Sequence, residues 1–172
     1  MLRGVTSDRR QRAVATIGVY GWTLERFLAA LDEAGVGLLV DVRQRRGVRG
    51  HEYAWANAGR LQAALADAGV RYAHHRELAP TTALRQLQYR EDDRLGVGKR
   101  SRAELAPAYR DGYLREILDG VDLAAFIAGL PADEASALLC VERDPQACHR
   151  SLVAERLAEE GGASIVHLLP AS

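Results

Sequence analysis

Five short runs of apolar and β-branched residues divide the chain, and helical repeats of apolar residues lie between them. The runs cover residues 13–19, 38–43, 70–74, 137–141 and 164–168. Short apolar runs bounded by turn residues are typical of strands that are covered on both faces. The alternation predicts an α/β fold, a single three-layer domain over residues 13–172 with a mostly parallel central sheet flanked by helices. Residues 1–12 are polar, and we expect them to form a flexible N-terminal segment.

Capping residues set the expected bounds of the first two helices. Thr23 precedes a helical repeat of leucine and phenylalanine, and Gly35 follows it. Asn57 and Gly69 bracket the second repeat in the same way. Small polar residues accept hydrogen bonds from the first free N–H groups of a helix, and glycine adopts the left-handed conformation that ends one. Both helices are therefore predicted to connect successive parallel strands.

The second half of the chain carries weaker signals. The stretch 91–100 is too charged to pack, so we interpret it as an exposed loop or lid. Ser101 and Glu104 have capping-box spacing, which predicts a helix start there unless Pro107 delays it. Asp144 followed by Pro145 is typical of an N-cap and a first helical position.

Composition excludes several functional classes. The 172 residues are 48% hydrophobic and 27% charged, which excludes a disordered chain. Lys and Arg total 23, as do Asp and Glu, so non-specific adhesion to nucleic acid or to a membrane surface has no overall charge to drive it. Two cysteines cannot form a disulfide framework, and no secretory signal or run of about 20 apolar residues is present. We therefore expect a cytoplasmic protein without a membrane span.

Polar and aromatic residues stand where the predicted strands end. Because ligands of open parallel sheets bind beyond the carboxyl ends of the strands, these residues are the first candidates for a site. They are Tyr20, Trp22, Asp41, Arg43, His74, His75, Glu142 and Arg143.

The segment 140–150 is the densest of these junctions. With Asp144 as N-cap, the helical wheel turns His149 and Arg150 toward the sheet and places Cys148 on the polar side. A guanidinium group at Arg150 requires a carboxylate or a phosphate, and either a structural ion pair with Glu142 or Asp41 or an anion site meets that need.

The other polar residues of this segment also have two interpretations each. His149 is either a general acid or base or a core histidine bonded to a carbonyl. Cys148, near a helix N-terminus, is either a nucleophile or an incidental surface cysteine. Cys140 is expected to be a core residue, and the long turn between it and Cys148 argues against a redox pair of the compact CxxC kind.

A second cluster, residues 41–51, follows the second strand and contains four arginines around two glycines. These arginines are Arg43, Arg45, Arg46 and Arg49, and the loop could wrap phosphate groups or simply be solvated.

His74, His75 and Glu77 lack a third ligand at a standard spacing, so we expect no metal. Phosphate-binding loops, GxGxxG and GxSxG are absent from the sequence, and we expect no cofactor.

Four ordered motifs resemble those of the family known as domain of unknown function 488. They are Thr16-Ile17-Gly18, Leu39-Val40-Asp41-Val42-Arg43, Leu138-Leu139-Cys140-Val141-Glu142 and Cys148-His149-Arg150. The resemblance covers about residues 13–168 and implies one α/β domain without an established activity. Family members commonly carry His-Ser where this chain has Val19-Tyr20. Many also carry a proline and a serine where this chain has Gln44-Arg45-Arg46-Gly47, which suggests a basic-loop subgroup.

Three functional hypotheses follow. The first is an enzyme that acts on a phosphorylated, nucleotide-like or nucleic-acid-derived substrate at the carboxyl edge of the sheet. In it the catalytic candidates are Asp41, Glu142 and His149, and the substrate-binding candidates are Tyr20, Arg43, Arg45, Arg46 and Arg150. The second is a non-catalytic anion-binding, nucleotide-binding or sensing module. The third is a thiol-dependent, rhodanese-like or redox protein that uses Cys148. All three expect acidic and cationic side chains, among them Asp41, Glu142 and Arg150, to gather in one pocket at the carboxyl edge of the sheet. Scatter of these three residues over different sides of the molecule would exclude a shared active centre.

Overall fold

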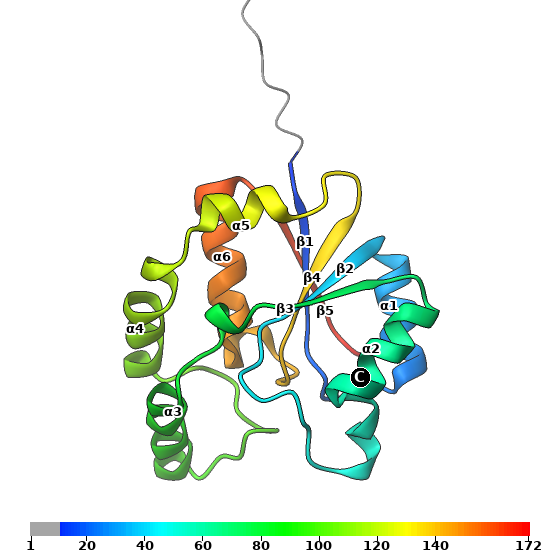
Figure 1. The fold of residues 1–172 in the computed structure, drawn as a ribbon. Helices are drawn as coiled ribbons and strands as arrows, with labels where there is room; N and C mark the ends of the chain where they lie inside the picture. The colour runs from blue at the N-terminus through cyan, green and yellow to red at the C-terminus, as the bar shows by residue number, and fades with distance from the viewer. Residues whose placement is uncertain (1–10) are drawn as a thin grey trace, which may run out of the picture.

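The computed structural model describes residues 11–172, and these form a five-stranded parallel sheet with helices on both faces (Figure 1). The strands are β1 (Ala13–Ile17), β2 (Val36–Asp41), β3 (Arg71–His74), β4 (Ala135–Leu139) and β5 (Ser164–Leu168). Their order is β3-β2-β4-β1-β5. The expected α/β class is confirmed. The expected flexible segment 1–12 lies almost wholly outside the described residues, although the Arg12 carbonyl accepts a hydrogen bond from the Ser164 N–H.

The described residues contain six α-helices. They are α1 (Leu24–Glu33), α2 (Ala58–Asp67), α3 (Thr82–Leu95), α4 (Pro107–Glu116), α5 (Leu123–Gly129) and α6 (His149–Gly161). Short 3-10 turns are η1 (His51–Ala56), η2 (Arg76–Leu78), η3 (Leu118–Gly120) and η4 (Pro145–Ala147). No helix among residues 11–172 is both long enough and apolar enough to cross a bilayer.

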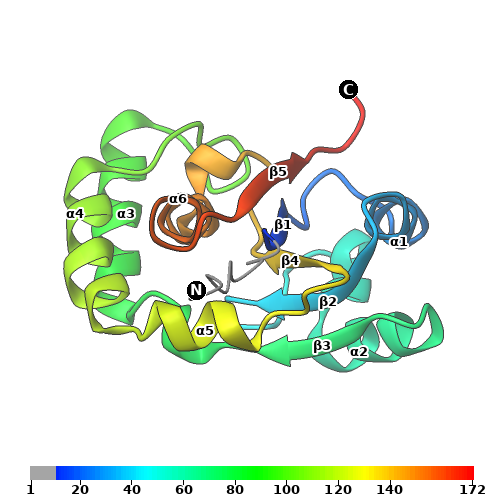
Figure 2. The ribbon, with the colours of Figure 1, turned by 90° about the horizontal axis from the view of Figure 1, so that it is seen from above.

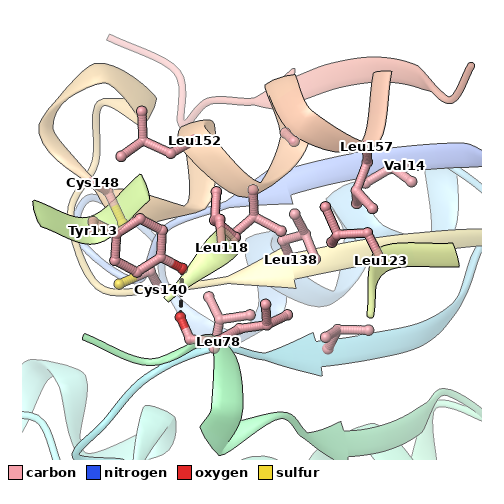
Figure 3. Close-up of a cluster of buried hydrophobic side chains, with 14 of the residues drawn as sticks. Val14, Leu78, Tyr113, Leu118, Leu123, Leu138, Cys140, Cys148, Leu152 and Leu157 are labelled. Carbon is pink, nitrogen blue, oxygen red and sulfur yellow. Dashed lines mark hydrogen bonds between the residues drawn. The ribbon is translucent and has the colours of Figure 1, made fainter. Parts of the chain in front are cut away.

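Alternation of side chains along the strands produces two separate cores, one on each face of the sheet. Val14, Val40 and Leu138 point to the face covered by α4, α5 and α6, with α3 beside α4. Leu39 and Leu139 point to the face covered by α1 and α2. Figure 2 shows the three layers from above, and Figure 3 shows part of the first core, where the Tyr113 hydroxyl donates to the Leu78 carbonyl at 2.5 Å.

The predicted helix starts are correct in the first half of the chain. The Thr23 hydroxyl accepts from the Arg26 N–H at 3.3 Å, and Gly35 has a positive φ of 66°. Asn57 stands at the N-cap of α2, but its side-chain oxygen accepts instead from the Val48 N–H at 2.7 Å. The Asn57 side chain therefore stabilises the arginine-rich loop at residues 41–51, called the basic loop below, rather than the start of α2.

One prediction for the middle of the chain is wrong, and another is decided in favour of its stated alternative. The charged stretch 91–100 is not all loop, because α3 continues to Leu95 and buries Asp92 against Arg102. The helix expected near Ser101 starts later, at Pro107, which is the delay that the sequence allowed for. The Leu105 N–H bonds the Gln146 carbonyl at 3.1 Å, and α4 begins at Pro107, which is well suited to the first helical position.

The start of α6 also differs from the prediction. Asp144 and Pro145 begin the 3-10 turn η4, and the α-helix starts at His149 with Cys148 as its N-cap. Cys148 is thus an extended residue outside the helical wheel, with φ −142° and ψ 144°. Its placement on the polar side is wrong, since the side chain is only 1% exposed. The inward placement of His149 and Arg150 is confirmed, because both are buried.

Candidate functional site

A cavity of about 780 Å³ opens at the carboxyl edge of the sheet. The chain leaves β2 toward α2 on one face and leaves the neighbouring strand β4 toward α6 on the other. Such divergence of adjacent connections opens a crevice in parallel sheets. In Figure 1 the central strands β1, β2 and β4 run downward, and the connection between α3 and α4 turns in below them. The cavity is lined mainly by three segments, 43–49, 98–105 and 140–149.

Basic side chains dominate the lining of the cavity. Glu142 is the one carboxylate among its described lining residues. Three of the basic side chains, Arg45, Arg49 and Arg85, form no ion pair with a carboxylate among residues 11–172. Arg85 donates to the Gln44 side-chain oxygen at 2.6 Å and to the Tyr89 hydroxyl at 2.7 Å. These partners are neutral, so the positive charge of the Arg85 guanidinium group is not compensated.

Four other cations of the lining are paired. Arg102 forms a two-point contact with Asp92, and its Nη1 lies 3.5 Å from Glu142 Oε1. Lys99 Nζ lies 3.8 Å from the same Glu142 oxygen. Arg43 pairs with Asp41, and Arg100 pairs with Glu52.

Aromatic rings line the same mouth. The Arg100 guanidinium group lies 5.2 Å from the ring centres of both Tyr20 and Tyr53. Of these two rings, Tyr20 lines the cavity. The mouth therefore presents both positive charge and flat apolar surface.

Two thiols and an imidazole form the floor of the cavity. His149 Nδ1 lies 3.8 Å from Cys140 Sγ and 3.8 Å from Cys148 Sγ. Cys140 Sγ also donates to Glu142 Oε2 at 3.3 Å. Figure 3 shows both sulfur atoms beside the Tyr113 ring. The reasoning against a paired Cys140 and Cys148 is wrong in space, because the chain folds back through η4 and brings their sulfurs within 4.8 Å of each other.

A backbone carbonyl fixes the orientation of the His149 ring. His149 Nε2 lies 2.8 Å from the Val42 carbonyl oxygen. Since a carbonyl can only accept, Nε2 carries the proton, and the lone pair of the neutral ring is on Nδ1. That lone pair faces the two sulfurs.

Glu142 is a permanent anion at this floor. Burial acts to raise its pKa, but the charge of Lys99, a backbone hydrogen bond and the charge of Arg102 lower that pKa to about 2. Burial itself raises the pKa of the Cys140 thiol well above its ordinary value. A carboxylate of such low pKa is a poor proton acceptor at neutral pH, so Glu142 serves best to hold Lys99 and Arg102 in place.

A family model for the domain of unknown function DUF488 matches residues 23–157, well over half of the chain. The chain belongs to the DUF488 family. Searches of curated proteins and of solved structures gave no match. The four motifs that resemble DUF488 contain seven charged, histidine or cysteine positions, and five of them line the cavity: Arg43, Cys140, Glu142, Cys148 and His149. The DUF488 motifs therefore meet mainly at this one place.

Asp41, the sixth of these positions, does not line the cavity. Its Oδ1 accepts from Arg43 Nε at 2.9 Å, and its Oδ2 accepts from Arg43 Nη2 at 2.8 Å and from the Tyr72 hydroxyl at 2.6 Å. Burial acts to raise the pKa of Asp41, but the hydrogen bonds and charge of Arg43 lower it below its ordinary value. The pair joins the ends of β2 and β3.

Arg150, the seventh position, also lies outside the cavity lining and is fully buried. Its guanidinium group donates to the carbonyls of Glu142 at 2.6 Å and Arg143 at 2.9 Å. The expected carboxylate partner is thus wrong, since backbone oxygens take that place. The single pocket expected for Asp41, Glu142 and Arg150 is not found, because only Glu142 lines the cavity.

The basic loop divides between two surfaces. Arg45 and Arg49 line the cavity, whereas Arg46 donates to the Tyr72 hydroxyl at 3.3 Å outside it. Sequence reasoning missed Arg85, Lys99 and Arg102, of which only Lys99 lies in the stretch 91–100 that is interpreted as an exposed loop or lid. The sequence did contain a signal for these residues. Charged residues are dense between residues 85 and 102, and an exposed lid alone does not explain that density.

Proposed function

We propose that this DUF488 protein is an enzyme that binds a phosphorylated, nucleotide-like substrate in the cavity at the carboxyl edge of the sheet. The observation that carries the proposal is the set of three guanidinium groups around one opening, Arg45, Arg49 and Arg85, that pair with no carboxylate of residues 11–172. Guanidinium groups bind phosphate oxygens through paired, charge-assisted hydrogen bonds. A phosphorylated ligand would supply the negative charge that these three groups lack among the described residues.

The size and lining of the cavity support a ligand of nucleotide size. Its volume of about 780 Å³ falls within the range of small-molecule sites. Tyr20 and Tyr89 line the opening together with the arginines, and aromatic rings stack on bases of any sequence. A phosphate at the arginines would leave a base or sugar ring within the same cavity.

The floor supports an enzyme rather than a passive receptor. A protein that only binds an anion requires the arginines, but it does not require two thiols and an oriented imidazole below them. Cys148 supplies a sulfur and His149 a proton-accepting nitrogen within the same cavity, 3.8 Å apart. In this proposal the arginines hold the anion, Glu142 holds Lys99 and Arg102, and the floor provides the reacting groups.

Binding is tested by thermal shift with matched pairs of ligands. AMP is compared with adenosine, glucose 6-phosphate with glucose, and a short oligonucleotide serves as a third anion. A ligand that binds the native state raises Tm, and at about 100 times its Kd it adds about 2.7 kcal/mol. We expect a rise with phosphorylated members only, and a smaller rise for Arg45→Ala and Arg49→Ala.

Arg60→Ala is the matched control, since Arg60 is exposed on α2 and does not line the cavity. It should respond to ligand as the wild type does. Equal responses of Arg45→Ala, Arg49→Ala and Arg60→Ala, or no phosphate-dependent rise in the wild type, would remove the support for the proposed site.

Turnover is tested on the ligand that binds best, by following its conversion chromatographically. We expect the wild type to convert it and His149→Ala to lose conversion, with circular dichroism confirming that the variant is folded. Binding by the wild type without any conversion would favour the non-catalytic module. Unchanged conversion by the folded His149→Ala variant would exclude a reacting role for the floor.

A further inference from the structure

Three atoms that commonly bind metals converge at the floor of the cavity. Among residues 11–172, the Cys140 Sγ, Cys148 Sγ and His149 side-chain nitrogen lie within 4.8 Å of one another, and all three residues are buried. The first comes from the segment after β4, and the other two come from the start of α6. Buried thiols and an imidazole lone pair aimed at each other leave a space in which a cation would bind.

The distances agree with a tetrahedral site. With metal–sulfur and metal–nitrogen bonds of about 2.3 and 2.05 Å, a tetrahedral zinc ion separates a sulfur from a nitrogen by about 3.6 Å. Both sulfurs lie 3.8 Å from His149 Nδ1. The two sulfurs lie within 4.8 Å of each other, whereas bonds of about 2.3 Å in a tetrahedral site place them about 3.8 Å apart, so completing the coordination would draw the sulfurs together by up to about 1 Å.

The surroundings orient these atoms as a metal site requires. Histidine ligands usually donate their second ring N–H to a carbonyl or carboxylate, and His149 Nε2 has this relation to the Val42 carbonyl at 2.8 Å. The Arg150 N–H lies 3.5 Å from Cys148 Sγ, so a backbone donor is in place for a thiolate. Neither contact occupies the lone pair of Nδ1.

We propose that Cys140, Cys148 and His149 bind one thiophilic divalent cation of the zinc class, with the fourth coordination position open to the cavity. Thiolate and imidazole ligands select Zn²⁺ over the oxygen-seeking Mg²⁺ and Ca²⁺. Three protein ligands with one open position are the arrangement of catalytic rather than structural zinc sites. Binding of the ion needs no substrate, and only its catalytic use rests on the proposed function.

The charges balance on binding. Two S–H bonds break, two sulfur–metal bonds form, and two protons pass to the solvent, while His149 donates an existing lone pair. Two thiolates neutralise the divalent ion, so Glu142 stays free to hold Lys99 and Arg102. The open position then faces the arginines, where a water molecule or a phosphoryl oxygen of the bound substrate would be polarised.

The test uses the untagged full chain, reduced, freed of metal with a chelator and titrated anaerobically with Co²⁺. We expect one equivalent to produce the near-ultraviolet thiolate-to-cobalt band and the strong visible bands of tetrahedral cobalt, and Zn²⁺ to remove both. Cys140→Ser and Cys148→Ser should each weaken the thiolate band, and His149→Ala should lower affinity for Co²⁺ by about 100-fold or more. Circular dichroism checks the fold of each variant.

His51→Ala is the control for loss of a histidine, because His51 is fully exposed and away from the cavity lining. Should His149→Ala fail to fold, the two near-isosteric serine variants decide the matter. No thiolate band in the wild type, or a band that both serine variants retain, overturns the metal site. Phosphate-dependent thermal shifts would survive that result, so failure of the metal site and failure of the proposed function are distinguishable.

Discussion

Replacing Asp41 by asparagine tests whether this motif carboxylate supports the fold rather than the chemistry. Asp41 and Arg43 have side-chain exposures of 0% and 1%, and Asp41 accepts four hydrogen bonds, from Arg43 Nε, Nη2 and backbone N–H and from the Tyr72 hydroxyl. Asparagine would keep the shape but leave a buried guanidinium group without a counter-charge. Breaking one partner of a buried ion pair costs about 3–5 kcal/mol of unfolding free energy.

The pH dependence of stability provides a second test of the Asp41–Arg43 pair. The pKa of Asp41 in the folded chain lies below the ordinary value of 3.8, despite the opposing effect of burial. A lowered folded pKa adds stability that is complete above the unfolded pKa and is lost as pH falls through the folded pKa. The difference in unfolding free energy between the wild type and Asp41→Asn should therefore be constant above about pH 5, and it should become smaller in more acid solution.

Urea denaturation at several pH values measures this gap. Glu134→Gln is the matched control, because its partner Arg71 lies at 2.6 Å but both side chains are about half exposed or more. Exposed pairs contribute about 1 kcal/mol or less. A loss in Asp41→Asn no larger than that in Glu134→Gln, or a gap that widens in acid, would refute the reasoning.

Three further substitutions test stability, two of them at the carboxyl edge of the sheet and one on α2. Gly18→Ala should lower the unfolding free energy by about 3 kcal/mol, because a Cβ there would lie 1.9 Å from the Glu142 carbonyl oxygen. A negligible loss in urea denaturation would contradict this expectation. Gly59→Ala on α2 meets nothing within 4 Å, so it should instead stabilise by about 0.5–1 kcal/mol in the same assay. Arg150→Ala should lose about 2 kcal/mol or more, since the carbonyls of Glu142 and Arg143 lose their donor, and a more stable variant would contradict the assignment.

Most of the sheet could be predicted from the sequence because its signals are local. The apolar run at 13–19 contains β1, and Thr23 and Gly35 bound α1 because both act within one turn of the helix. The carboxyl ends of β3 and β5 were predicted correctly, but those of β1, β2 and β4 were placed two residues too late. Val42 and Val141, for example, continue the apolar pattern beyond the ladder. Their burial comes from tertiary packing, which a local pattern does not separate from strand pairing.

The site was less predictable because its geometry depends on long-range contacts. Lys99 and Arg102 reach the cavity only because Asp92 and Glu142, distant in sequence, hold them there. Cys148 was misplaced for a different reason. The five-residue delay from Asp144 to the first residue of α6 takes Cys148 off the helical wheel and folds its sulfur inward toward His149.

The central claim is that phosphorylated ligands bind in the cavity at the carboxyl edge, and an amide NMR titration of the wild type with AMP tests it most directly. The account predicts that the shifts gather in the segments 43–49, 98–105 and 140–149. It also predicts that the groove beside α1, lined by Trp22, Arg26 and Leu168, stays silent. Shifts that gather at that groove, or that adenosine reproduces in full, would contradict the account.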